Sequence, residues 1–404
     1  MQRIIFANLH GNEFLLKTLN KIIFKQSVAI KHKYLLDYLL QSDEFEVCTY
    51  LNDNSFSMSY SHAGITPKWL VKLEHKYCLK KNGIPSDKIT ILTKEDQIMK
   101  DDILIMYNYY TNQYDFKKRP DCLIAISHIH FNTSNADKMR AIDPDVLYNE
   151  ANFSHGSIIF DKFYSWLQKM FEVIPFVFAD RLQNVKPFNA RQNMCFSTGT
   201  VNSMHHITPY YGDPCAQPAR KQIMTHKEEL LPFVDCYNSD YAEDTAGGLL
   251  KANNVCARIY NVVYSKLFTG RQKKYYSFNM VEKFNDYKMC LVCEEIMGIP
   301  GVGFVEGMAC GCAYIGQNKG YYEDYGMQEG VHYIGYDGSI ADLKDKIAYY
   351  QMPGHQEELE RIAKTGCEFV RKNFCGPVIA EKFLNTPNIF IEFFKLPYKN
   401  RCET

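Results

Sequence analysis

A glutamate behind a glycine-rich turn is the feature of this chain with the clearest chemical potential. The segment Glu294–Gly316 reads EEIMGIPGVGFVEGMACGCAYIG, with Gly301 and Gly303 in the turn. We predict a helix that begins near Phe304 and therefore places Glu306 in its first turn. The free N–H groups and the positive dipole of such a helix end attract an anion, and a carboxylate nearby can accept hydrogen bonds from a diol.

An anion site beside a diol acceptor suits a ligand that carries both groups, and a diphosphate joined to a ribose is such a ligand. This is the common part of the nucleotide-sugars. We therefore predict that Glu306 accepts hydrogen bonds from the ribose hydroxyls, and that the backbone of Gly301, Val302 and Gly303 faces the diphosphate or the sugar. The alternatives without a ligand are a simple tight turn and an acid that only stabilises the helix dipole.

Two more acids precede this turn. Glu294 and Glu295 follow the apolar run Lys288–Cys293 (KMCLVC), which has the length of a buried strand. Ligands bind at the carboxyl ends of strands in open α/β sheets, so one of these acids could hold sugar hydroxyls. Because adjacent residues of a strand point to opposite faces, we expect only one of the two to face a ligand.

The run VEGMACGCAYIG resembles the nucleotide-sugar motif of GT-B glycosyltransferases, especially the group 1 families, in which a glutamate opens a helix followed by M-A-C-G and a strand. The later segments Gly320–Gly326, Gly330–Ile334, Ile340–Gln351 and Glu357–Phe374 are similar to the end of the same domain. The resemblance covers about residues 190–380.

The chain departs from the group 1 pattern at one position. The common pattern has a second glutamate eight residues before the first, where this chain has Gly298. In addition, the stretch Asp286–Glu294 is similar to the Y-K-x-x-L-x-x-E stretch of α1,3-fucosyltransferases, another GT-B family. The donor sugar and the exact family therefore stay open.

The resemblance implies an α/β GT-B fold, with two Rossmann-like doubly wound domains facing a central cleft. Residues 1–187 would bind the acceptor, residues 188–384 would bind the nucleotide-sugar, and residues 385–404 would form a tail that crosses back to the first domain. We take the segment Arg181–Gln192 as the linker between the domains.

Alternation of strands and helices along the first half supports a parallel, doubly wound sheet. Helical spacing is present within Glu13–Leu40 and Thr66–Asn82. The predicted strands are Arg3–Ala7, Phe45–Leu51, Ile89–Leu92, Asp102–Tyr107, Asp121–Ser127, Val146–Asn149 and Val173–Ala179. The second half opens with the strand Met194–Ser197, and further predicted elements are a basic helix at Ala219–Phe233, a strand at Asp235–Tyr237 and a helix at Ala252–Tyr264.

A diphosphate requires cations or dipoles, and the second half offers several basic residues. By the resemblance, an Arg/Lys pair on the first loops and helices of the second domain contacts the diphosphate. The candidates are Arg220 and Lys221 in the basic helix, Lys274 before Tyr275–Met280, and Lys288 in the fucosyltransferase-like stretch. A solvated charged face is the alternative for each of them.

Three histidines are candidates for the acceptor side. His10 follows the first strand, and His128 and His130 follow the strand Asp121–Ser127. The pKa of a histidine is close to working pH, so His10 could act as general base if the enzyme inverts the anomeric configuration. A retaining enzyme would not need this base, and simple hydrogen bonding is the alternative for all three.

The sequence carries no pattern that requires a metal or another cofactor. His128 and His130 have the i, i+2 spacing of metal ligands, but no third ligand is evident. The D-x-D triplet at Asp143–Asp145 introduces a strand and is expected by chance in an acidic chain. We therefore predict no obligatory metal and no cofactor besides the nucleotide-sugar substrate.

The composition indicates in which cellular compartment the protein works and which classes of partner it can bind. The 46 basic and 46 acidic residues of the 404 cancel, and no basic stripe with interleaved aromatics appears, so nucleic acid is excluded as a partner. The 14 cysteines are scattered, which is typical of free thiols in a reducing cytoplasm. The apolar tail leaves peripheral contact with the inner membrane face open.

Together these observations predict a glycosyltransferase of hexosyl or deoxyhexosyl type, which moves a sugar from a UDP- or GDP-sugar to a glycan or glycolipid acceptor. The resemblance further implies a bacterial enzyme of capsule or lipopolysaccharide synthesis. The alternatives are a GT-B transferase of another activated group, such as a polyol-phosphate, and a catalytically degenerate GT-B scaffold protein. A nucleotide-sugar epimerase of the same fold is a minor option.

Overall fold

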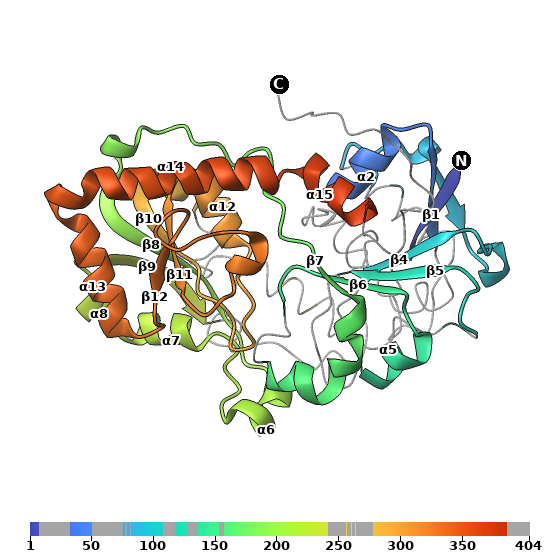
Figure 1. The fold of residues 1–404 in the computed structure, drawn as a ribbon, viewed down its shortest axis with the longest axis horizontal. Helices are drawn as coiled ribbons and strands as arrows, with labels where there is room; N and C mark the ends of the chain where they lie inside the picture. Colours follow the sequence, from blue (N-terminus) through green and yellow to red (C-terminus); the bar gives the residue numbers. More distant parts are fainter. Residues whose placement is uncertain are drawn as a thin grey trace.

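The computed structural model describes residues 1–7, 33–50, 82–107, 118–127, 136–152, 157–240 and 278–385, with the single residues 76, 79, 80, 116, 256, 260 and 263 between them. These residues form two lobes side by side, each built around its own parallel sheet (Figure 1). We refer to the lobe with β1–β7 as the first lobe and to the lobe with β8–β12 as the second lobe.

In the described ranges, the sheet of the first lobe has the strand order β3-β2-β1-β4-β5-β6-β7, and all its neighbouring strands are parallel. The chain moves outward from β1 in one direction and then returns to place β4 on its other side. Its strands are β1 (Gln2–Ala7), β2 (Phe45–Tyr50), β3 (Ile89–Leu92), β4 (Ile103–Tyr107), β5 (Leu123–Ser127), β6 (Val146–Asn149) and β7 (Phe171–Val173). Its helices are α2 (Lys33–Leu40), η1 (Ser86–Lys88), η2 (Glu95–Gln97), α5 (Ala136–Ile142), η4 (Phe160–Tyr164) and η5 (Ser165–Met170).

The sheet of the second lobe is also parallel in the described part of the chain, with the order β12-β11-β10-β8-β9. The chain places β9 on one side of β8 and then adds β10, β11 and β12 on the other side, so the strand order reverses between β8 and β10. Its strands are β8 (Gln192–Val201), β9 (Val234–Asp240), β10 (Tyr287–Leu291), β11 (Ala313–Gln317) and β12 (Ile334–Tyr336). In open α/β sheets such a reversal leaves a crevice at the carboxyl ends of the two strands, where ligands bind.

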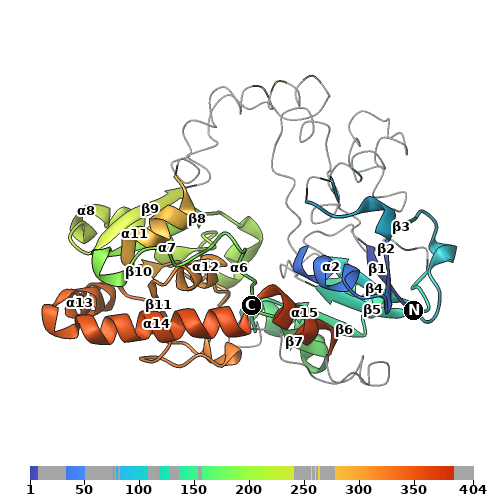
Figure 2. The same ribbon diagram turned by 90° about the horizontal axis from the view of Figure 1, so that it is seen from above.

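Helices cover the second sheet, and α14 runs along the lobe toward the first one (Figures 1 and 2). The amphipathic helix α14 buries Leu359, Ile362 and Val370 along one stripe, which holds it against the sheet. The helices are η6 (Phe188–Ala190), η7 (His205–Ile207), α6 (Thr208–Tyr211), α7 (Pro218–Thr225), α8 (Lys227–Leu230), α11 (Met280–Asp286), α12 (Gly303–Ala309), η10 (Glu323–Tyr325), α13 (Ile340–Gln351), η11 (Pro353–His355), α14 (Gln356–Asn373) and α15 (Gly376–Leu384).

The predicted α/β fold with two doubly wound sheets is confirmed, but two predicted elements are wrong in detail. The strand expected at 173–179 ends at Val173, because Pro175 has no N–H to continue the ladder after Ile174 N–H donates to Asn149. The basic helix expected at 219–233 divides into α7 and α8, because His226 has a non-helical backbone conformation. Of the helical spacing expected within 13–40, the structure describes Lys33–Leu40 as α2, and the helices expected at 66–82 and 252–264 fall largely outside the described residues.

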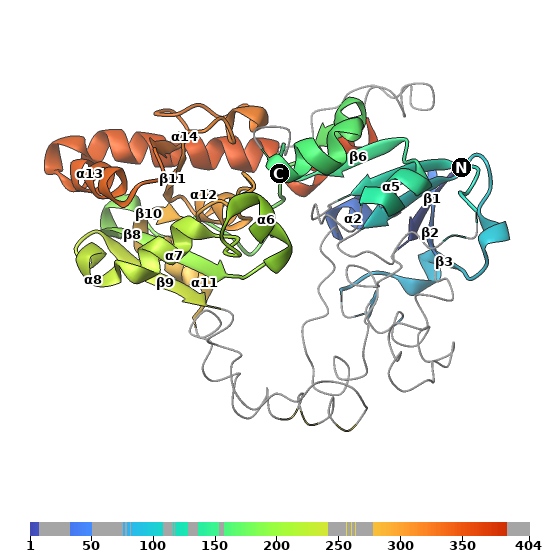
Figure 3. The same ribbon diagram turned by 90° about the horizontal axis from the view of Figure 1, so that it is seen from below.

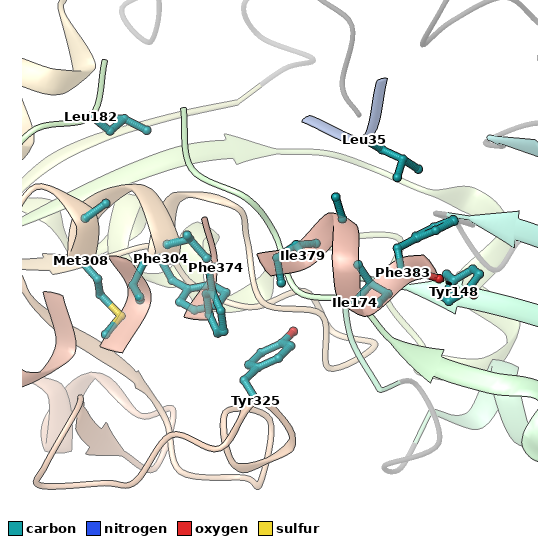
Figure 4. Close-up of a cluster of buried hydrophobic side chains, with 14 of the residues drawn as sticks. Leu35, Tyr148, Ile174, Leu182, Phe304, Met308, Tyr325, Phe374, Ile379 and Phe383 are labelled. Carbon is teal, nitrogen blue, oxygen red and sulfur yellow. Dashed lines mark hydrogen bonds between the residues drawn. The ribbon is translucent and has the colours of Figure 1, made fainter. Parts of the chain in front are cut away.

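The last described helix, α15, crosses from the second lobe to the first and packs beside α2 (Figure 2). The ring of Phe383 stacks on Tyr148 at a centroid distance of 4.0 Å, and the Tyr148 hydroxyl donates to the carbonyl of Phe383 over 2.9 Å. Figure 4 shows the apolar cluster that results, with Ile379 and Phe383 between the two lobes. The tail at 386–404, for which the crossing was predicted, lies outside the described residues.

Helix α12 lies unusually close to the sheet because two of its residues have no side chain. A Cβ at Gly303 would lie 2.8 Å from Cγ2 of Val292, and a Cβ at Gly307 would overlap the Sγ of Cys290. Real Cβ atoms essentially never come so close, so each position requires glycine. The spacing of the two glycines therefore sets how near the helix that carries Glu306 approaches β10.

We predict that Gly307→Ala destabilises the protein by about 1–3 kcal/mol, because the new methyl group overpacks the contact with Cys290 and Phe284. Chemical denaturation measures the change. The double variant Gly307→Ala/Cys290→Ala removes the overlapping sulfur and should recover part of the loss. Gly354→Ala is the matched control, since no atom lies within 4 Å of its added Cβ. Equal losses at both glycines would contradict the close-packing account.

Candidate functional site

A buried arginine bridges the two strands between which the second sheet reverses. Arg220, on α7, is 7% exposed. Its Nη1 donates to the carbonyl of Thr200 over 2.9 Å, and its Nη2 donates to the carbonyl of Cys293 over 2.8 Å. These carbonyls lie at the carboxyl ends of β8 and β10. The guanidinium therefore occupies the crevice where a ligand of an open α/β sheet is expected.

Two glycines make room for this guanidinium. A Cβ at Gly199 would lie 2.7 Å from its Nε, and a Cβ at Gly301 would lie 2.8 Å from its Nη2. Gly199 also has φ +144°, a conformation that other residues rarely adopt. The Nε of Arg220 is buried and has no hydrogen-bond partner among the described residues. One donor of the cation is thus unpaired in this part of the chain, which is rare for a buried group.

The glycine turn lies beside this arginine at Gly301, and Glu306 follows the turn along α12. Helix α12 begins at Gly303 and has Glu306 in its first turn, as predicted. Phe304 N–H donates to Gly301 and Val305 N–H to Val302, whereas the N–H groups of residues 301–303 have no acceptor in the described part of the chain. The Val302 side chain is 44% exposed. The turn therefore presents free backbone donors beneath an exposed apolar side chain.

The Glu306 carboxylate is partly buried and accepts no hydrogen bond from the described residues. Burial raises its pKa above the usual value, and the Arg181 guanidinium, from the segment between the two sheets, partly offsets this effect. A half-buried carboxylate with free acceptor sites suits a ligand that brings hydroxyl donors. This is the group expected from the sequence for a ribose.

Glu294 is 2% exposed and belongs to a buried polar network. Its Oε1 accepts hydrogen bonds from the backbone N–H of Gln317 over 2.9 Å and from the Tyr322 hydroxyl. Its Oε2 is buried and has no partner in the part of the chain that the structure describes. Burial raises the pKa of Glu294, although the hydrogen bonds to its charged form oppose the shift.

Glu295 is held by the opposite side of the crevice. Its Oε1 accepts a hydrogen bond of 2.9 Å from the Gln217 side chain, and its Oε2 is buried with no partner among the residues described. Burial raises its pKa, and the positive charge of Arg220 lowers it. Both Glu294 and Glu295 lie beyond the end of β10 at Leu291, so the strand alternation used for the prediction does not apply to them.

Several polar groups at this edge were not predicted from the sequence. They are buried atoms that find no hydrogen-bond partner in the described ranges: the hydroxyls of Thr198, Ser239 and Tyr211, and Oδ1 of Asn238. Thr198 lies near the end of β8, and Asn238 and Ser239 lie near the end of β9. Small polar residues at the ends of two adjacent apolar strands were the available signal. Nothing in the sequence pattern indicated that Tyr211 lies at this edge, because its helix α6 has only four residues.

The structure therefore brings Arg220, the turn 301–303, Glu294, Glu295 and Glu306 to one edge of the sheet. It does not bring Lys221 or Lys288 into the same group. Lys221 is exposed and lies 3.9 Å from Asp213. Lys288 lies at the amino end of β10, where its Nζ donates to Gln356 over 2.5 Å. The remaining predicted residues, which are His10, His128, His130 and Lys274, lie outside the described residues.

Two features are absent from the described residues. These residues contain no group of three or more His, Cys, Asp or Glu side chains placed to hold a metal ion. None of their helices is both long and apolar enough to cross a bilayer. Asp145, from the D-x-D triplet, accepts hydrogen bonds from Arg119 and from the backbone of Ile124, so it stabilises the start of β5.

One stretch of the chain matches a known family. Residues 252–385 match a family model described as "Glycosyl transferase-like", and this segment includes Glu294, Glu295 and Glu306. No curated protein matches the chain in sequence.

Solved structures share the fold over nearly the whole chain. The crystal structure of Anabaena Alr3699/HepE in complex with UDP has a TM-score of 0.53 and 12% identity, covering 95% of this chain and 99% of that chain. The same protein in complex with UDP-glucose has a TM-score of 0.52 and 11% identity, with the same coverage. A glycosyltransferase from Rickettsia africae ESF-5 has a TM-score of 0.51 and 12% identity, covering 98% of each chain. The fold is therefore GT-B.

We predict that Glu294→Gln stabilises the protein by about 1–2 kcal/mol at pH 8, because it removes a buried carboxylate with an unpartnered oxygen. The folded-state pKa of Glu294 is raised, so the stability of the unsubstituted protein falls as pH rises from the ordinary carboxyl range through that pKa. The advantage of the variant should therefore be smaller at pH 5 than at pH 8.

Denaturant titrations at the two pH values measure this difference, with the exposed residue Glu360, changed to Gln, as the control. An advantage that is equal at both pH values, or larger at pH 5, would contradict the assignment of an ionised, poorly solvated Glu294.

Proposed function

We propose that this protein is a glycosyltransferase that moves a hexosyl or deoxyhexosyl group from a nucleotide-sugar, UDP- or GDP-linked, to a glycan or glycolipid acceptor. The observation that carries the proposal is the partly buried Glu306, which accepts no hydrogen bond from the described residues, in a helix that begins at the free N–H groups of residues 301–303, next to the buried Arg220. These groups provide a diol acceptor, backbone donors and a cation at one crevice, as a diphosphate with a ribose requires.

Two comparisons support this proposal. The region with the three glutamates matches the glycosyltransferase-like family model. The GT-B fold is shared with a protein that was solved in complex with UDP and with UDP-glucose. The sequence resemblance to group 1 families points to the same donor class, and the stretch similar to α1,3-fucosyltransferases leaves a GDP-linked deoxyhexose as the second candidate donor.

The catalytic task of the second lobe follows from these groups. Arg220 and the backbone donors stabilise the charge that develops on the leaving diphosphate, because preorganised donors in a water-poor site stabilise such a charge strongly. Glu306 positions the nucleotide, and correct positioning of two reactants contributes a large part of the rate. We propose that no metal ion is required for this step.

The acceptor is proposed to be a bacterial capsule or lipopolysaccharide precursor, on the basis of the group 1 resemblance. A glycolipid acceptor would bring the enzyme to the inner face of the membrane. A GT-B transferase of another activated group and a degenerate scaffold protein are the alternatives. Gly298, which stands where group 1 enzymes have their other glutamate, is the observation that favours the scaffold.

We predict that UDP or GDP raises the melting temperature of the protein, and that Glu306→Gln weakens nucleotide binding about 10–100-fold. The reason is that hydrogen bonds to a charged carboxylate contribute about 1.5–3 kcal/mol. Calorimetric titration measures the affinity. Glu360→Gln is the matched control, because Glu360 lies on the exposed side of α14.

The pH dependence provides an independent readout of Glu306. Because burial raises its pKa, lowering the pH from 8 to 6 should weaken nucleotide binding more in the unsubstituted protein than in Glu306→Gln. Nucleotide binding that is identical in the two proteins would remove Glu306 from the site. Absence of binding by UDP- and GDP-sugars would favour the scaffold.

We predict that His10→Gln lowers kcat about 10²–10⁴-fold while donor affinity stays unchanged, if His10 is the general base of an inverting enzyme. His128 and His130 are the further acceptor-side candidates, and the same substitution in each ranks them. NMR of the product determines the anomeric configuration. A retained configuration together with unchanged kcat in His10→Gln would exclude this role.

A further inference from the structure

The segment between β8 and α7 leaves the sheet of the second lobe and closes on itself. We refer to residues 202–217 as the strap. Met204 N–H donates to the carbonyl of Pro214 over 2.7 Å, and Ala216 N–H donates to the carbonyl of Asn202 over 2.9 Å. An antiparallel bridge lies between these two bonds. The two ends of the strap are therefore held together, and η7 and α6 form its middle.

The apolar residues of the strap are buried against the first lobe, although the chain before and after them belongs to the second. Ile207 and Ala216 are both 0% exposed. They belong to one apolar cluster with first-lobe residues such as Ile5 and Phe160, whereas the buried apolar residues of the strands β9 to β12 belong to two other clusters. In Figures 1 and 3, α6 lies next to the green segment of the first lobe that contains η4 and η5. Burial of the strap therefore depends on contact between the lobes.

An aromatic contact joins the strap to η4. The Tyr210 ring meets the Phe163 ring edge to face, with centroids 5.6 Å apart. Lys162 Nζ lies 5.1 Å from the centre of the Tyr210 ring and 5.8 Å from the centre of the Phe163 ring. Edge-to-face pairs and cation–π contacts require a defined orientation of the rings as well as a short distance. This contact therefore fixes how the strap lies on the first lobe.

The base of the strap is bonded to the loop that carries Glu295. The carbonyl of Ala216 accepts a hydrogen bond of 2.8 Å from Ile296 N–H. Gln217, at the end of the strap, is 1% exposed. Its Oε1 accepts a hydrogen bond from Asn202 N–H over 2.8 Å, and its Nε2 donates to Glu295 Oε1 over 2.9 Å. One buried side chain thus closes the strap and holds a carboxylate at the crevice.

The loop 294–300 also contacts the first lobe. Met297 is 3% exposed and belongs to the same apolar cluster as Ile207 and Ala216. Two backbone hydrogen bonds keep the loop compact, since Glu295 N–H donates to residue 299 and residue 298 N–H donates to Glu295, each over 2.8 Å. Strap and loop therefore form one structure, which the first lobe covers on its apolar side and which carries Glu295.

We propose that the strap couples the first lobe to the crevice, because its docking on the first lobe holds the loop 294–300, and with it Glu295, in place. Gln217 acts as the positioning residue. Two lobes move relative to each other by default unless a large apolar interface restrains them. Here the restraint reaches the loop through backbone hydrogen bonds and packed side chains, which form a contiguous connection. The inference goes beyond the proposed function, since it holds for any ligand of the crevice.

A second crossing keeps the lobes together when the strap is loosened. Helix α15 contacts the first lobe at the opposite end of the contact from α6 in the view of Figure 1. In addition, the Tyr325 hydroxyl donates to the carbonyl of Glu150 over 2.5 Å. Substitutions at the aromatic contact therefore leave these bonds intact, and their effect on the loop can be measured in the folded protein.

The test is hydrogen–deuterium exchange of the full chain, followed by mass spectrometry. Phe163→Ala removes the first-lobe side of the aromatic contact. We expect the backbone amides of the peptides 202–217 and 294–300 to exchange about 10-fold faster, because the free energy of local opening falls when the contact is lost. Tyr210→Ala, on the strap itself, should have the same effect, whereas α13 and α14 should exchange as before. The decisive peptide is 294–300, since Phe163 belongs to the other lobe.

Two variants serve as controls. Tyr210→Phe conserves the ring and should exchange like the unsubstituted protein. Ile98→Ala removes an apolar side chain that packs against the same cluster from the first lobe, and it should leave both peptides unchanged. If Phe163→Ala and Tyr210→Ala accelerate exchange only in 202–217, the strap does not hold the loop and the proposal is wrong. Equal acceleration in Ile98→Ala would also overturn it, because general loosening of the first lobe would then explain the result.

Discussion

The buried guanidinium of Arg220 is the constraint on which the rest of the site depends. Burying a charge costs several kcal/mol unless hydrogen bonds compensate, and the available acceptors here are the carbonyls of Thr200 and Cys293. Reaching both requires glycine at positions 199 and 301, because any side chain would overlap the cation. One arginine thus constrains the composition of both adjoining turns and the place where charge of opposite sign can bind.

The absence of side chains at two glycines likewise determines how close α12 lies to the sheet. Helices normally keep their distance from a sheet through their side chains, whereas Gly303 and Gly307 let this helix contact Val292 and Cys290 directly. The start of the helix is thereby fixed relative to Arg220. As a result, the free N–H groups of residues 301–303 and the carboxylate of Glu306 lie at the same edge of the sheet. A rigid start of this kind is what positioning of a substrate requires.

Local signals were enough to predict α12, α13 and the strands around them, since glycine turns, apolar runs and helix periodicity are properties of short segments. The contacts within the site could not be predicted from such short segments. The partners of Glu295 and Arg220 lie 78 and 73 residues away along the chain, in Gln217 and Cys293, and no local pattern reveals such pairs. Sequence reasoning also counted Lys288 as a ligand group, although β10 places it at the opposite edge of the sheet, because a motif does not show to which end of a strand it belongs.

The helix that carries Glu306 is also part of the contact between the lobes. A single apolar cluster runs from Phe304 and Met308 on α12, through Phe374 and Ile379, to Tyr148 of the first lobe (Figure 4). Separating α15 from the first lobe would expose this surface, at a cost of about 25 cal/mol for each Å² of apolar area. The proposed nucleotide site and the contact between the lobes therefore share one core.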